Sequence, residues 1–169
     1  TAAIKRIVRA VFSLKSAFVA LAAVMSVKVF AAFEKGIASV STLVDTSKVN
    51  MAKLSSGVLK LGKDTGDSFS SLTSALFDTV SAGVNAGDSM KFLGVASKLA
   101  IGGSTSTANA VKGLVSVMNA YGLEASSAQS ISDSLFQAMK GGITTIELMA
   151  ANVGKVAPIA RQAGLSFDE

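Results

Sequence analysis

Near the start of this sequence, apolar residues recur at alternating steps of three and four, and this spacing constrains the fold more than any other feature. A heptad pattern of this kind puts one apolar stripe on a single face of an α-helix. The pattern holds over three heptads, and no Gly or Pro interrupts it before Gly36. We interpret the stripe as an oligomer seam, formed by Ile4, Ile7, Val11, Leu14, Phe18, Leu21 and Met25.

The predicted helix, from about residue 2 to residue 33, is apolar around most of its girth. It would be about 45–50 Å long at 1.5 Å per residue. Such a helix must be covered on several sides, by copies of itself, by the rest of the chain or by a bilayer. The uncharged run at 16–27 has 12 residues, whereas a bilayer span needs about 20. We favour burial in a homo-oligomer, and the other two covers stay open.

The rest of the sequence is also helical in pattern, and its breaks fall at glycines. Period-two alternation is scarce, so no strand is predicted. Glycines that follow apolar runs, such as Gly122 and Gly164, fit left-handed helix ends. The single Pro, Pro158, predicts a turn or the kinked start of a helix. The predicted helices are 47–61, 67–81, 87–100, 105–120, 127–140, 144–153 and 155–163.

A weak repeat is visible in the glycine positions. Gly83 aligns with Gly122, and Gly102-Gly103 aligns with Gly141-Gly142, and the offset is the same in both cases. A period of about 40 residues with two helices per unit is typical of stacked helical hairpins. The predicted fold is therefore all-α, with a long N-terminal apolar or coiled-coil helix followed by short helices in Gly-linked hairpins.

The composition argues against most site chemistry. Cys and His are absent, which excludes zinc sites of Cys and His, disulfides and an imidazole base. The segment 57–64 approaches a phosphate-binding loop, but Asp64 follows the lysine where that loop needs Ser or Thr. We therefore expect no catalytic residues, no cofactor, no metal and no enzyme activity.

The charge distribution and the mean hydropathy both indicate that this chain has binding partners. Residues 1–63 carry a net charge of +8 and residues 64–169 carry −3. The basic first third suits an acidic partner, although spaced lysines can also form an ordinary solvated face. A mean hydropathy of +0.52 is high for a free soluble domain. The sequence starts at Thr1 and stops in a capping pattern, Ser166 to Glu169, so we expect an internal segment of a longer protein.

Several phrases in residues 67–169 go beyond composition. They are Ser81-Ala82-Gly83-Val84, Asn119-Ala120-Tyr121-Gly122-Leu123, Ile131-Ser132-Asp133-Ser134-Leu135-Phe136, Gly142-Ile143-Thr144-Thr145-Ile146-Glu147-Leu148 and Gly154-Lys155-Val156-Ala157-Pro158. In this order they resemble the tape measure proteins of tailed bacteriophages, close to the N-terminal side of that long helical chain. Residues 1–40 resemble the family only in character.

The resemblance implies a structural role without catalytic residues. A tape measure protein lies in the lumen of the phage tail, sets tail length during assembly in the host cytoplasm, and leaves ahead of the DNA. The implied partners are copies of itself (a trimer favoured, a hexamer as the alternative), the tail tube protein, tail-tip or baseplate proteins and tail assembly chaperones. Contact with the host membrane and phage DNA is implied during ejection.

The predicted organisation has three parts. Residues 1–40 form an apolar basic helix for oligomerisation or membrane activity, residues 41–66 a helical linker, and residues 67–169 a helical-hairpin tape measure segment. Two other functions stay open. One is a membrane-active pore former or translocator that inserts residues 10–33, and the other is an α-solenoid binding module.

Overall fold

The computed structural model describes residues 27–142 and 144–167. These residues form seven α-helices and one 3₁₀ turn, with no strand among them. The helices are α2 (Val27–Ser41), α3 (Met51–Thr65), α4 (Phe69–Ser81), α5 (Ser89–Gly102), α6 (Thr107–Tyr121), α7 (Ala128–Gly141) and α8 (Ile146–Gln162), with η1 (Ala125–Ser127) before α7. The predicted all-α class is confirmed for this part of the chain. The predicted N-terminal coiled coil lies outside it.

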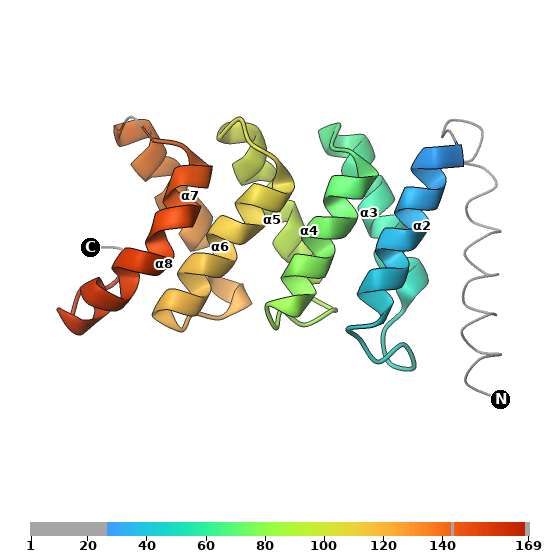
Figure 1. The fold of residues 1–169 in the computed structure, drawn as a ribbon, viewed down its shortest axis with the longest axis horizontal. Helices are drawn as coiled ribbons and strands as arrows, with labels where there is room; N and C mark the ends of the chain where they lie inside the picture. The colour runs from blue at the N-terminus through green and yellow to red at the C-terminus, as the bar shows by residue number, and fades with distance from the viewer. Residues whose placement is uncertain (1–26, 143, 168–169) are drawn as a thin grey trace.

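The helices stack in two rows (Figure 1). The even row is α2, α4, α6 and α8, and each of these helices packs on the next. The odd row, behind it in the figure, is α3, α5 and α7, which also contact one another in order. Each odd helix and the even helix that follows it form a hairpin, so the whole is a short solenoid of helical hairpins.

The repeat found in the glycines is present in the structure. The odd helices α3, α5 and α7 begin at Met51, Ser89 and Ala128. The even helices α4, α6 and α8 begin at Phe69, Thr107 and Ile146, and these starts are separated by the same two steps as those of the odd helices. The structure therefore adds α3–α4 as a further unit, which the glycine alignment did not include.

Helices α4, α6 and α8 end in closely similar ways. Gly83, Gly122 and Gly164 have φ of 89°, 68° and 81°, which is the left-handed conformation that glycine adopts without strain. The residue after each glycine donates its backbone N–H to the carbonyl five residues before it, over 2.9–3.3 Å. These are Schellman ends, and those of α4 and α6 turn the chain toward the next unit.

Side-chain caps begin α3 and the even helices α4, α6 and α8. Asn50, Ser68, Ser106 and Thr145 each accept a hydrogen bond from the backbone N–H three residues later. Helix α7 starts differently, since the 3₁₀ turn η1 leads into it and Ser127 makes no side-chain cap.

One apolar core runs through the stack between the two rows. It extends from Phe33 in α2 to Ile146 in α8 and includes Leu54, Leu76 and Leu114. The core therefore takes residues from all three predicted segments. The division into 1–40, 41–66 and 67–169 stays a prediction.

Two local predictions are wrong. Helix α2 does not end at residue 33 but continues through Gly36 to Ser41, because Phe33, Ile37 and Val40 bury one face against the neighbouring helices. Pro158 neither makes a turn nor starts a helix, since it lies inside α8, which joins the two helices predicted at 144–153 and 155–163.

Candidate functional site

The predicted oligomer seam lies outside the described residues. All seven of its members, from Ile4 to Met25, precede Val27, where the description begins. The structure therefore does not place the seam, and the homo-oligomer stays a prediction. The candidate features that the structure does place are a polar link between hairpins, a pocket at the C-terminal end and the outer surfaces of the helices.

The polar link joins successive units at the starts of the even helices. The Thr107 hydroxyl, at the start of α6, donates to the Asp67 carboxylate just before α4, and it lies 3.0 Å from the hydroxyl of Ser97 in α5. One unit further on, Thr105 donates to the Glu147 carboxylate at the start of α8. Asn109 donates to the same carboxylate over 3.2 Å. These bonds hold neighbouring hairpins in register.

The hydrogen bonds of this polar link change the pKa of the Glu147 carboxylate. The bond from the Thr105 hydroxyl, followed by the backbone N–H of Glu147 itself, lowers the pKa of Glu147 below its ordinary value, and burial opposes this only in part. The position also suits a negative charge, since Glu147 lies in the first turn of α8, where the helix dipole is positive. Glu147 is thus an anionic contact between units.

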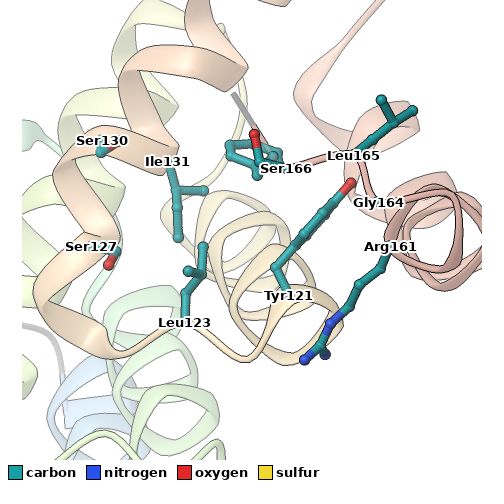
Figure 2. Close-up of a pocket in the computed structure, with 10 residues that line it drawn as sticks. Tyr121, Leu123, Ser127, Ser130, Ile131, Arg161, Gly164, Leu165 and Ser166 are labelled. Carbon is teal, nitrogen blue, oxygen red and sulfur yellow. The ribbon is translucent and has the colours of Figure 1, made fainter. Parts of the chain in front are cut away.

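A pocket of about 400 Å³ lies at the last hairpin (Figure 2). Its walls come from the ends of α6 and α8, from η1 and α7, and from the segment after α8. The Phe167 ring packs edge-on against Tyr121, with ring centroids 5.5 Å apart and planes at 64°. Arg161 donates to the Ala120 carbonyl over 3.5 Å. The lining residues are Tyr121, Leu123, Ser127, Ser130, Ile131, Arg161, Gly164, Leu165, Ser166 and Phe167.

The pocket offers hydrogen bonds and an aromatic wall rather than reaction chemistry. Its lining holds hydroxyls and one guanidinium, but no carboxylate or imidazole to act as a general base. Sequence reasoning did not predict it, because the wall is made by residues a full repeat apart in the chain, such as Tyr121 and Arg161. Only the stacking of hairpins brings them together.

Two other kinds of site are absent from the described residues. No group of three or more His, Cys, Asp or Glu there could hold a metal ion. No helix in that part of the chain has the length and apolar character needed to cross a bilayer. The segment 57–64, which resembled a phosphate-binding loop, lies within α3, so it is helix and not loop.

Comparison with known proteins gives the family. The family model described as "Phage-related minor tail protein" matches residues 55–169. This chain belongs to that family. A relative described as a "Probable tape measure protein", from Clostridium phage phiCD119, is 30% identical over 146 residues. No solved structure matches the chain.

The family assignment confirms the resemblance read from the sequence phrases. The chain is a phage tail-related protein, homologous to a tape measure protein. The match covers 84% of this chain but only 16% of the relative's length. The chain thus corresponds to about one sixth of that relative.

Proposed function

We propose that this chain is a structural segment of a tape measure protein, which sets tail length inside the tail tube and leaves ahead of the DNA on ejection. The single observation that carries the proposal is the relative matched across 84% of the chain. The helical architecture supports it, because helices supply a defined rise per residue. On this proposal the segment performs no catalysis.

The repeat makes tail length a direct test. Deleting residues 89–127 removes α5, α6 and η1, and it joins α4 to α7 at an equivalent boundary of the repeat. If the deleted segment forms a continuous helix in the tail, it spans about 58 Å. In a phage whose tail carries this chain, we expect tails shorter by about that length in electron micrographs.

A replacement provides the matched control. Substituting a second copy of residues 128–166 for residues 89–127 keeps the residue number, and we expect it to restore the original length. Tails of unchanged length after the deletion would show that this segment does not act as a ruler. A change of only about 10 Å, the spacing of packed helices, would show that it stays stacked and would also overturn the extended ruler.

We further propose that the seam from Ile4 to Met25 assembles the chain into a trimer, with a hexamer as the alternative. Its partners would then be the tube protein, tail-tip or baseplate proteins and assembly chaperones, first in the host cytoplasm and then in the tail lumen. Leu14→Asp should dissociate the oligomer in sedimentation equilibrium. Ser16→Asp, about 200° around the same helix, should not. A monomeric native chain would rule the seam out.

The stacked hairpins favour a second candidate, an α-solenoid that binds a peptide or protein partner. Solenoids build extended binding surfaces in this way, and the pocket beside Tyr121 lies at one end of the stack. This candidate predicts a monomer that binds a tail protein through its helices. The membrane-active alternative depends on residues 10–33, most of which lie outside the described residues, and leakage from liposomes would test it.

A further inference from the structure

Four lysines occupy equivalent places on neighbouring helices of the odd row. Lys53 and Lys60 lie seven residues apart in α3, and Lys91 and Lys98 lie seven residues apart in α5. Each lysine of α5 follows its counterpart in α3 by the separation that also divides the starts of the two helices. The repeat therefore superimposes the two pairs.

All four side chains are exposed and point away from the core. In α3 the buried residues include Met51, Leu54 and Val58, and at 100° per residue both of its lysines lie on the opposite face. The same holds in α5, where Phe92, Leu93 and Ala96 are buried. Two helical turns separate the lysines of one helix by about 10 Å, and packed helices lie about 8–10 Å apart. The four lysines thus mark the corners of a square about 10 Å on a side.

Nothing acidic lies inside this square. Between the lysine pairs the outward positions are Ser56 and Gly57 in α3 and their counterparts in the next unit, Gly94 and Val95 in α5. The half-buried side chain of Met90 in α5 lies against Gly57. The nearest acids along the two helices are Asp64, in the last turn of α3, and Asp88, which precedes α5. The third helix of the row, α7, has Ser130 and Gln137 at the corresponding positions. The lysine square is therefore confined to α3 and α5.

The chemistry of the square selects one kind of partner. A protein–protein interface has an apolar or aromatic centre, whereas the apolar side chains inside the square, Met90 and Val95, are half-buried against the core. Single-stranded nucleic acid is held by aromatic platforms, and no aromatic residue occupies the outward positions between these lysines. Contacts to the phosphates of a duplex need only cations such as lysine.

We propose that the lysine square binds the phosphate backbone of double-stranded DNA without sequence preference. The site involves α3 and α5 only. DNA binding by these lysines goes beyond the proposed function. It would hold even if another segment set the tail length. The isolated lysines of the sequence become a site because the stack places equivalent residues of successive units side by side.

The test uses the full chain and a labelled duplex of arbitrary sequence, about three helical turns long, with binding followed by fluorescence anisotropy between about 50 and 200 mM salt. The test variant carries Lys53→Gln, Lys60→Gln, Lys91→Gln and Lys98→Gln together. Each phosphate contact contributes about 0.9 to the slope of log K against log salt. We expect the slope to fall by about 3–4, and affinity at the lowest salt to weaken by about tenfold or more.

The matched control removes the same charge from even-row helices, through Lys28→Gln, Lys35→Gln, Lys112→Gln and Lys155→Gln. All variants keep the basic residues before Val27, and circular dichroism checks that each one folds. Equal losses in the two variants, or a native chain that does not bind the duplex, would overturn the proposal. Vesicles containing phosphatidylserine that bind more tightly than DNA through the same four lysines would show that a membrane surface is the partner instead.

Discussion

Gly36 of α2 lies directly against Thr73 of α4. A Cβ added at Gly36 would lie 2.5 Å from the Thr73 Cβ and closer still to its hydroxyl oxygen. Thr73 is only 2% exposed, and its hydroxyl donates to the Ser70 carbonyl over 3.1 Å, so it has little room to yield. This contact fixes how closely the first two helices of the even row approach.

Gly36→Ala should therefore destabilise the fold, although alanine is the better helix former. Overpacking costs about 1–3 kcal/mol, and the gain in helix propensity returns about 1 kcal/mol. We expect a net loss of up to about 2 kcal/mol in the free energy of unfolding, measured by urea denaturation. Gly94→Ala is the control, because a Cβ at Gly94 of α5 would meet nothing within 4 Å. That variant should be more stable than the native chain, and a loss in both would contradict the packing argument.

Glu147 should make the stability of the fold depend on pH. Its pKa is lowered in the folded chain, chiefly by the hydroxyl of Thr105. The carboxylate therefore stabilises the fold above its ordinary pKa, and this contribution is lost as the pH falls through its lowered value. Glu147→Gln should cost about 1 kcal/mol at pH 7 and progressively less toward pH 3.

Thermal unfolding of the native chain and Glu147→Gln across this pH range measures the difference. Glu124→Gln, in the loop before η1, removes one carboxylate that is exposed and provides the baseline. A gap between the native chain and Glu147→Gln that stays constant with pH would show that the charge of Glu147 contributes nothing to the link between α6 and α8.

Leu114 and Leu148 should respond very differently to truncation. Leu114 of α6 is fully buried in the core, whereas Leu148 of α8 is 55% exposed. Leu114→Ala removes buried methyl groups and leaves a cavity, at a cost of about 2–5 kcal/mol. Leu148→Ala should change the free energy of unfolding by less than about 0.5 kcal/mol. Urea denaturation of both variants measures the two costs, and similar losses would mean that α8 is covered in solution by another chain.

The sequence predicted helices well where the signal is local. The apolar period and the glycines placed α5, α6 and α7 close to their observed ends. It failed where tertiary packing decides, as at Gly36, where a buried face carries the helix past a residue of poor propensity. It also could not show the lysine square or the pocket beside Tyr121, because both arise only when the stack places residues of successive units, far apart in the chain, near one another. The comparisons confirm the family read from the phrases, while the seam lies outside the described residues.

Pro158 weakens the last turns of α8. Proline lacks the backbone N–H that would bond to the Gly154 carbonyl, and its ring crowds that carbonyl, a combination that costs about 3 kcal/mol inside a helix. Helix α8 nevertheless continues through Pro158 to Gln162, and Ala157 beside it is buried. We infer that packing of α8 on α6 holds the helix past the proline, which leaves its last turns the easiest part of α8 to open.

Pro158→Ala should therefore stabilise the C-terminal end of the stack. We expect a higher melting temperature and slower amide hydrogen exchange at residues 159–163, with little change in α5. Because Arg161 and Phe167 line the pocket, the same substitution should also hold the Tyr121–Phe167 contact more firmly, which slower exchange at 164–167 would report. Ala151→Pro is the converse variant. It introduces a proline nearer the start of α8, and it should open the helix and the pocket together. Unchanged exchange in Pro158→Ala would show that the missing hydrogen bond is already replaced by another contact.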